Sequence, residues 1–299
     1  MDVEFETCDV FTSARFGGNP LALVYGADGL EDTALQAIAR EFNLSETVFV
    51  LPPEREPADV RLRIFTPGME LPFAGHPNVG AAVMIARRIG HEGEQLVLEQ
   101  PAGHVTAWLT RGPNGGTAGG PVAAEIEAPL PLTLGVSFDR AAIAACCALP
   151  VEAIHVNAHP PLMAGCGAPF VIAEIEDVEL LAAATPDILA MRQCFGPMAS
   201  PPVGLLLHTP LGIGRRRARM FAPLNGVVED PATGSANVAL AGLLLHLAGG
   251  SSLALEVEQG ADLGRPSLLV LAARRELDGG IRVRVGGGVV PVSRGVMSL

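Results

Sequence analysis

Apolar residues in the first third of the chain recur with two different periods. Between residues 32 and 42 they stand at Leu35, Ile38, Ala39 and Phe42, which is the spacing of one face of an α-helix. Three nearby segments are rich in Val, Ile, Leu and Phe, as strands are, and they span residues 21–25, 47–51 and 60–65. The pattern therefore predicts a strand, a helix and two further strands, in that order.

Two further segments, residues 77–89 and 235–247, are apolar on nearly every side. Their length suits a helix, and a helix without a polar face is one that is buried all round. We expect each helix to be wrapped by the strands of its own sheet. No apolar run approaches the roughly 20 residues needed to span a bilayer, so no membrane segment is expected.

The two halves of the chain repeat one another in four places and in the same order. The repeated segments are 18–21 and 167–170, 61–67 and 217–223, 75–80 and 234–239, and 99–100 and 258–259, at offsets of 149 to 159 residues. The longest shared pattern is R-x-R-[IM]-F-x-P. Repetition in the same order predicts two copies of one structural unit.

Residues 111–121 are rich in glycine, and a turn-rich stretch of this kind is typical of a boundary between units. We therefore expect an N-terminal lobe of residues 1–115 and a C-terminal lobe of residues 120–299, whose last strand could return to the first lobe. The predicted fold class is α/β (α+β), with two pseudo-symmetric lobes that each wrap a curved sheet around a central apolar helix.

The acidic balance of the chain favours a small molecule as its partner. Its 299 residues are 49% hydrophobic, with a formal net charge of -12 and a pI near 5.0. Nucleic acids and anionic membranes bind clustered Lys and Arg, so neither is expected as a partner. Within the one dense basic run, residues 215–219, Arg217 and Arg219 alternate with a smaller residue, as along one face of a strand. The run is therefore interpreted as a solvated strand face.

The cysteines and histidines do not predict a disulfide framework or a metal. Five cysteines without a C-x-x-C pair suit reduced thiols in a cytoplasm, and the N-terminus does not look like a signal peptide. Cys166, the one thiol beside a repeated motif, is interpreted as a small buried residue. His155 and His159 have the i, i+4 spacing of metal ligands, but prolines follow at once and no third ligand is evident.

The two apolar helices begin at equivalent glycines, Gly75 and Gly234. Unpaired backbone N–H groups and the positive end of the helix dipole favour a carboxylate or phosphate there. If the lobes pack about a pseudo-twofold axis, the two starts can face each other across a cleft and bind a small organic acid. Alternatively, both glycines only open their helices, with Pro77 tolerated in the first turn.

The loops before these helices differ in chemistry, because one contains His76 and the other contains Asp230, Thr233 and Ser235. This asymmetry fits an enzyme in which one lobe carries an acid-base group and the other orients the substrate. Asp230 could equally be a turn or cap residue, and His76 could be a polar group at a helix start.

Glu46 lies between the predicted helix and the apolar strand 47–51. A carboxylate that enters an apolar strand can be partly buried, and burial would raise its pKa toward the range useful for proton transfer. The alternative is a solvated residue at the start of a strand, and the residues alone leave both interpretations open.

Several segments together resemble the signatures of the PhzF-like family of phenazine biosynthesis. They are residues 9–12 and 18–20, 43–50, 65–77, 230–236 and 259–267. The resemblance runs from one end of the chain to the other, so it is far more specific than a single glycine motif. It implies a diaminopimelate-epimerase-like fold, usually as a homodimer.

The resemblance also implies a mechanism. In the family's phenazine enzyme, the glutamate that matches Glu46 moves a proton between two carbons of dihydro-3-hydroxyanthranilate, without cofactor or metal. We therefore expect a cofactor-free isomerase acting on a small anionic organic acid. The resemblance assigns the site residues as follows: Glu46, His76 and Asp230 for catalysis, and Gly75, Gly234 and Ser235 for substrate binding.

Other functions remain open. A binding protein that lost the reaction would tolerate glutamine at position 46. An amino-acid racemase or epimerase is a further alternative, although the two-cysteine enzymes of this fold carry paired thiols at the glycine loops, where this chain has no cysteine. The glycine segments 17–20 and 286–288 lack a following helix with the dinucleotide fingerprint, which disfavours a dehydrogenase.

Overall fold

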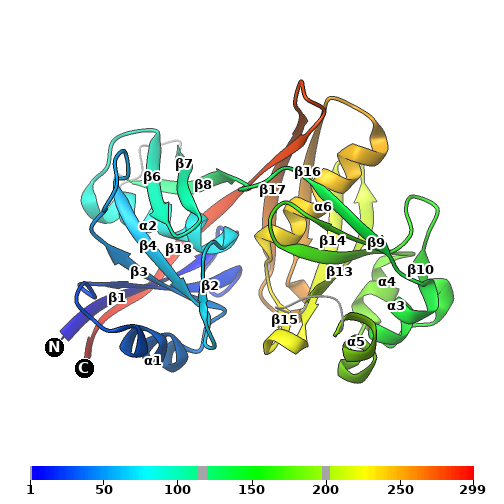
Figure 1. The fold of residues 1–299 in the computed structure, drawn as a ribbon, viewed down its shortest axis with the longest axis horizontal. Helices are drawn as coiled ribbons and strands as arrows, with labels where there is room; N and C mark the ends of the chain where they lie inside the picture. Colours follow the sequence, from blue (N-terminus) through cyan, green and yellow to red (C-terminus); the bar gives the residue numbers. More distant parts are fainter. Residues whose placement is uncertain (1, 113–119, 197–202) are drawn as a thin grey trace. The chain divides into compact units, whose positions relative to one another are not determined.

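A computed structural model describes residues 2–112, 120–196 and 203–299, and these form two compact units (Figure 1). The first unit comprises Met1–Glu127 and Gly286–Leu299, and the second comprises Ala128–Val285. The boundary lies later than the expected 115–120, because β8 (Pro121–Glu127) pairs with β7 (Gly103–Arg111) of the first unit. Most of the turn-rich stretch, residues 113–119, lies outside the described residues.

The first unit is a sheet whose strand order closes on itself. The strands run in the order β18–β1–β2–β3–β4–β6–β7–β8, and β8 pairs again with β18. The β2–β3 and β4–β6 pairs are parallel. The strands not yet given are β1 (Asp2–Val10), β2 (Asn19–Tyr25), β3 (Glu46–Leu51), β4 (Val60–Phe65), β5 (Glu70–Leu71), β6 (Gln95–Gln100) and β18 (Ile281–Ser298). The C-terminal part of β18 lies antiparallel to β1, so the last strand does return to the first unit.

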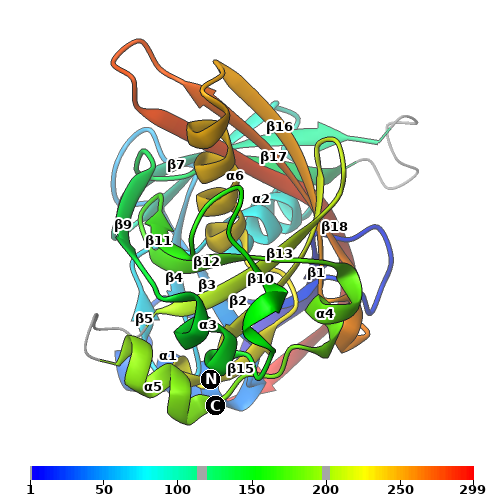
Figure 2. The same cartoon turned by 90° about the vertical axis from the view of Figure 1, so that its right-hand side faces the viewer.

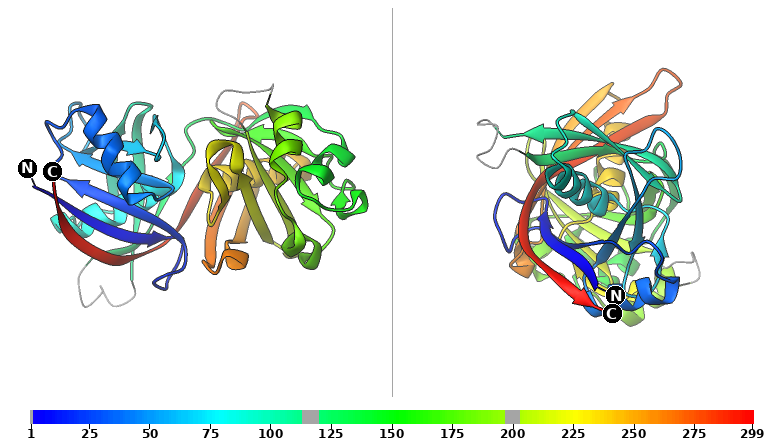
Figure 3. Two further views of the ribbon diagram at one scale, coloured as in Figure 1. Left: turned by 90° about the horizontal axis from the view of Figure 1, so that it is seen from below. Right: turned by 90° about the vertical axis from the view of Figure 1, so that its left-hand side faces the viewer.

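Helix α2 (Gly75–Ile89) lies inside this sheet, and every residue from Gly75 to Ala86 is buried. Figure 3 (right) shows α2 in teal, with strands of its unit around it. The packing is close at Gly80, where an added Cβ would come within 2.6 Å of Leu21 Cδ2 and 2.7 Å of Val10 Cγ2. The prediction that this apolar helix is buried all round is confirmed.

Helix α1 (Asp32–Phe42) covers the outer face of the same sheet (Figure 1). Its buried residues are Leu35, Ile38 and Ala39, and they contact Phe49 of β3 and other sheet residues in one apolar cluster. The helix and its apolar face match the prediction from the sequence.

The second unit repeats these connections. Its parallel pairs are β12–β13 and β14–β16, joined by the antiparallel pairs β11–β12, β13–β14, β14–β15 and β16–β17. Helix α6 (Gly234–Ala248) takes the place of α2, and Figure 2 shows it along β16 and β17. The strands are β9 (Thr133–Ser137), β10 (Ile154–His155), β11 (Leu162–Gly165), β12 (Pro169–Ile175), β13 (Gly204–Gly212), β14 (Arg215–Ala222), β15 (Val227–Asp230), β16 (Ser252–Gln259) and β17 (Ser267–Arg275).

Among the described residues, three short helices form the outer layer of the second unit, where the first unit has α1. They are α3 (Arg140–Cys146), α4 (Val178–Ala183) and α5 (Ile188–Phe195). Their apolar residues pack with β12 and β13 in one cluster that includes Ile143, Leu181 and Met191.

All four repeated motifs occupy equivalent places in the two units. They lie at the starts of β2 and β12, along β4 and β14, at the starts of α2 and α6, and at the ends of β6 and β16. The duplication and the mixed α/β class inferred from the sequence are therefore confirmed. Among the described residues, no helix is long and apolar enough to cross a membrane.

Candidate functional site

Glu46 is placed by the sharp connection between α1 and β3. The helix ends at Asn43, which adopts a left-handed conformation with φ 51°, and Glu46 then opens β3 opposite Leu21 of β2. Its side chain is 17% exposed, whereas the next residue, Thr47, is fully buried. Glu46 is therefore the partly buried carboxylate that the sequence allowed, and not a fully solvated residue.

His76 lies in the first turn of α2 and its Nδ1 is 3.2 Å from Glu46 Oε2. Burial lowers the pKa of His76 to about 3. A hydrogen bond with the backbone of Pro20 raises this pKa, but its effect is weaker. Proline has no N–H, so the Pro20 carbonyl must accept this bond. The imidazole is thus neutral near pH 7, and its contact with Glu46 is not an ion pair.

Helix α2 begins without a side-chain cap among the described residues, at the extended residue Ala74. Asn78 instead donates to the Ala74 carbonyl (2.9 Å) and pairs with the side-chain amide of Gln100 on β6. The backbone N–H groups at Gly75 and His76 are therefore not taken by a cap, which is what an anion site at a helix start requires.

Helix α6 also begins without a side-chain cap within the described ranges, although Thr233 stands at the N-cap position. The Thr233 hydroxyl donates instead to Asp230 Oδ2 at 2.5 Å, and its oxygen accepts from Gln259 Nε2 at 3.2 Å. Asp230 is 7% exposed, Gly234 is buried and Ser235 is partly buried. Asp230 ends β15 (Val227–Asp230), and Gly234 and Ser235 open α6, so these residues lie within one short segment. The sequence named the Thr233 hydroxyl in this segment but not its bond to Asp230.

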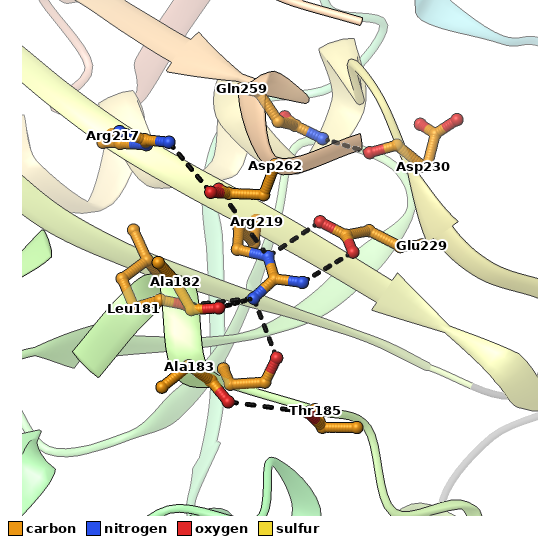
Figure 4. Close-up of polar contacts among 11 residues, drawn as sticks. Leu181, Ala182, Ala183, Thr185, Arg217, Arg219, Glu229, Asp230, Gln259 and Asp262 are labelled. Carbon is orange, nitrogen blue, oxygen red and sulfur yellow. Dashed lines mark hydrogen bonds and ion pairs between the residues drawn. The ribbon is translucent and has the colours of Figure 1, made fainter. Parts of the chain in front are cut away.

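Gln259, at the end of β16, holds this loop in shape. Its Nε2 donates to the Asp230 carbonyl at 2.8 Å, a bond that Figure 4 shows. Its Oε1 accepts from Asn237 Nδ2 at 2.7 Å, and Asn237 also donates to the Thr233 carbonyl. Asn237 and Gln259 thus repeat the pairing of Asn78 with Gln100, and the repeated Glu-Gln and Gly-x-x-Asn motifs were the sequence signal for it.

The segment after Gln259 supports the same loop from the other side. Gly260 has φ +75°, and an added Cβ would lie 2.5 Å from the carbonyl oxygens of Pro231 and Arg265. Only glycine fits this position without displacing backbone. Ser267 Oγ donates to the Pro231 carbonyl at 3.0 Å.

The interpretation of residues 215–219 as a solvated strand face is wrong for Arg219. Arg219 is 8% exposed, and its guanidinium forms two 2.8 Å hydrogen bonds with the carboxylate of Glu229 (Figure 4). It also donates to the carbonyls of Leu181, Ala182 and Ala184 beside α4. The guanidinium is buried because it joins the end of an outer helix to the sheet, a contact that periodicity along one strand does not reveal.

All five cysteines are described and each is a free thiol. The helix starts carry none of them. Burial raises the pKa of Cys166 to about 12, so this residue is a thiol and not a thiolate near pH 7. The position and the protonation state agree with its interpretation as a small buried residue.

Each unit therefore brings together a different set of groups at an uncapped helix start. The first unit offers the carboxylate of Glu46, the neutral imidazole of His76 and the backbone N–H of Gly75, which has no side-chain cap among the described residues. The second offers a carboxylate and two hydroxyls at Asp230, Thr233 and Ser235. Carboxylate, imidazole and hydroxyl groups are side chains of the kind used in acid-base chemistry.

Comparison with known proteins gives the family. The profile of the phenazine biosynthesis-like proteins (PhzC-PhzF) matches residues 8–295. An uncharacterized isomerase of Mesorhizobium japonicum is 38% identical over 296 residues, covering 96% of each chain. The trans-2,3-dihydro-3-hydroxyanthranilate isomerase of Pseudomonas chlororaphis is 38% identical over 300 residues, covering 97% of this chain and 98% of the relative.

The chain belongs to the phenazine biosynthesis-like family and is a PhzF-family isomerase. The crystal structure of a PhzF-family protein of Bacillus anthracis matches all of both chains with a TM-score of 0.87 at 22% identity. The fold is accordingly diaminopimelate-epimerase-like, as the sequence predicted.

Proposed function

We propose that this chain isomerises a small carboxylic acid of the dihydro-3-hydroxyanthranilate type without a cofactor, and that Glu46 moves the proton. The observation that carries the proposal is the place of Glu46, a partly buried carboxylate 3.2 Å from a neutral imidazole at an uncapped helix start. Partial burial keeps water away from a carboxylate and makes it a better base than a solvated one.

The proposed reaction needs no oxidant or reductant. The Glu46 carboxylate removes a proton from one carbon, and the electron pair of that C–H bond moves into the conjugated system of the substrate. The protonated Glu46 then returns the proton to a different carbon. The double bonds have moved, and the enzyme has returned to its starting state.

His76 acts in this proposal as the partner that orients Glu46. The neutral imidazole packs 3.2 Å from the carboxylate and limits its position without placing a full positive charge beside it. Because its pKa is lowered to about 3, His76 does not itself deliver a proton as an imidazolium near pH 7.

The substrate's carboxylate is proposed to bind at helix starts. In the first unit the backbone N–H of Gly75 is a donor that suits an anion, and in the second unit the backbone N–H of Gly234 and the hydroxyl of Ser235 are such donors. Asp230, held by Thr233 and Gln259, is proposed to act on the polar substituents of the substrate. A homodimer in the cytoplasm is part of the same proposal and rests on the family resemblance.

The test is proton NMR of the purified protein in deuterium oxide with trans-2,3-dihydro-3-hydroxyanthranilate and a panel of cyclic and amino carboxylic acids. The wild type is expected to put solvent deuterium on a substrate carbon and to form an isomer. Glu46→Gln should lower this rate by about 10²- to 10⁴-fold, the usual worth of an acid-base group. Glu54→Gln is the matched control, since Glu54 is a largely exposed carboxylate of the same unit.

Two outcomes would overturn the proposal. If both proteins exchange deuterium equally, Glu46 is not the base. If neither changes any compound while some bind, the chain is a binding protein. Inversion at one carbon without migration of a double bond would favour the epimerase alternative.

A further inference from the structure

A second cluster of ionisable groups lies wholly in the second unit and contains neither proposed catalytic residues nor a helix start. It consists of His159, Glu174 and His208, which are 2%, 5% and 0% exposed. One ligand atom from each lies within 4.8 Å of the others. Glu174 and His208 stand directly opposite each other in the parallel pair β12–β13, so the strand register brings them together.

The tautomer of His159 follows from its neighbour. His159 Nδ1 lies 2.8 Å from the Pro160 carbonyl, which can only accept a hydrogen bond. Nδ1 therefore carries the proton, and Nε2 keeps its lone pair. That lone pair points to His208 Nε2, 3.3 Å away.

His208 as a neutral imidazole carries one proton, and that proton cannot satisfy both of its neighbours. If His208 Nε2 carries the proton, it bonds to His159, and the unprotonated His208 Nδ1 faces Glu174 Oε2 at 3.9 Å. Among the described residues, His208 Nδ1 and Glu174 Oε2 have no hydrogen-bond partner. A proton on Nδ1 would be too far from Glu174 for a hydrogen bond and would leave two nitrogen lone pairs opposed at 3.3 Å.

Either arrangement buries acceptors against acceptors, which is costly unless a positive group lies among them. From this arrangement we propose that His159, Glu174 and His208 bind a divalent transition-metal ion of the Zn²⁺ type. Two imidazoles and one carboxylate are a common three-residue set for Zn²⁺ and leave a fourth position for water. Zn–N bonds of about 2.0–2.1 Å in a tetrahedral site place two nitrogens about 3.3–3.4 Å apart, which matches the observed 3.3 Å.

The outer contacts of the cluster also suit a metal. Asn157 Nδ2 donates to His155 Nε2 at 3.1 Å, so His155 carries its proton on Nδ1 and donates it to Glu174 Oε1 at 2.8 Å. This contact occupies Oε1 and leaves Oε2 for the metal. The Pro160 carbonyl does the same for His159, since it orients the ring and directs the Nε2 lone pair inward. Partners of this kind orient ligands in metal sites.

The test uses the full chain, stripped of metal with a chelator and titrated with Zn²⁺ against a chromogenic chelator. We expect one Zn²⁺ per chain, a higher melting temperature with Zn²⁺, and an X-ray absorption spectrum with nitrogen and oxygen neighbours at about 2.0–2.2 Å and no sulfur. His155→Ala should weaken binding about 10- to 100-fold, because it removes the group that orients Glu174. Glu174→Gln, which is nearly isosteric, should weaken it more.

His246→Gln and Cys194→Ser are the controls, since His246 is exposed and Cys194 is the least buried thiol. Both should bind Zn²⁺ like the wild type. The proposal is overturned if the wild type takes up no stoichiometric Zn²⁺, if Cys194→Ser abolishes binding, or if His155→Ala and Glu174→Gln both keep the wild-type affinity. If Glu174→Gln does not fold, His155→Ala decides, because His155 is 30% exposed and tolerates truncation.

Discussion

In the first unit, helix α2 starts beside Glu46 and His76; in the second, helix α6 starts beside Asp230, Thr233 and Ser235. Both starts lack a side-chain cap among the described residues, and both are fixed by an asparagine of the helix that pairs with a glutamine of the sheet. The scaffold of the helix start has therefore been kept in both copies, while the side chains around it have changed.

The register of the strands shows what replaced Glu46 in the second unit. Glu46 lies opposite Leu21 in the β2–β3 pair. In the second unit, Phe170 is the repeat equivalent of Leu21, and Gly204 lies opposite it in the β12–β13 pair. A Cβ at Gly204 would already lie 3.1 Å from Met220 Sδ. The second unit thus has no side chain, and little space for one, where the first has its carboxylate. Duplication here yields one unit with a carboxylate beside an imidazole and one unit without this pair.

The largest effect is expected where the two units share an ion pair with different burial. The Arg219–Glu229 ion pair of the second unit corresponds to the Arg63–Glu70 ion pair of the first. The Arg219 side chain is 9% exposed, whereas that of Arg63 is 21% exposed. Arg219→Met should lower the free energy of unfolding by about 3–5 kcal/mol, because it leaves Glu229 buried and uncompensated. Arg63→Met should cost about 1 kcal/mol, nearer to a surface pair. Denaturant unfolding measures both, and equal losses would contradict the comparison.

The next effect separates the roles of the two helix starts in the reaction. His76→Gln should lower kcat about 100-fold with little change in KM, because a misplaced Glu46 reacts poorly. Ser235→Ala should raise KM about 2- to 10-fold and leave kcat nearly unchanged, since it removes one hydrogen bond to the substrate. Steady-state kinetics on the compound found by NMR checks the split. A pure KM effect of His76→Gln would count against its orienting role.

The asparagine and glutamine pairs should differ in stability. Asn78→Ala leaves the Gln100 side-chain amide without a partner among the described residues, and should cost about 1–3 kcal/mol. Asn237→Ala should cost less, because Gln259 keeps its contacts with Asp230 and Thr233. Thermal unfolding of the two variants, side by side, gives the difference. A larger loss for Asn237→Ala would reverse the proposed ranking.

The last effect is the pH dependence that His76 introduces, and it is gradual because it is spread over several pH units. Its pKa is about 3 in the folded protein and 6.5 in the unfolded chain, so between these values only the unfolded chain takes up the proton. Stability from this group is complete above pH 6.5 and falls as the pH drops toward 3, by at most about 1.4 kcal/mol per pH unit. His76→Gln should flatten this part of the acid unfolding curve. Ser235→Ala, at the equivalent position, should leave the curve unchanged.

Much of the fold could be predicted because it depends on local patterns. The spacing of Leu35, Ile38 and Ala39 defined α1 with its observed ends, and two all-apolar segments identified the buried helices. The four repeated motifs revealed the duplication before any contact was known. The boundary between units was less well predicted, because composition marks a turn but not which sheet a following strand joins.

The candidate site could be predicted only as a set of residues. The repeat and the family resemblance identified Glu46, His76 and the two helix starts, because these are motifs of short range. The neutral state of His76 and the diversion of the Thr233 hydroxyl to Asp230 required the structure. Protonation depends on burial, which is a property of all neighbours together.

Local patterns in the sequence were enough to predict three strands, three helices, the duplication and the residue types at two helix starts, since these follow from periodicity and from motifs within a few residues. Only the tertiary structure decided which distant residues meet. Arg219 is buried against the end of α4, and the register of β12 and β13 places Glu174 opposite His208, with His159 close to both. The physical reason is that strand pairing fixes contacts between residues far apart in the chain, and no local pattern encodes that register.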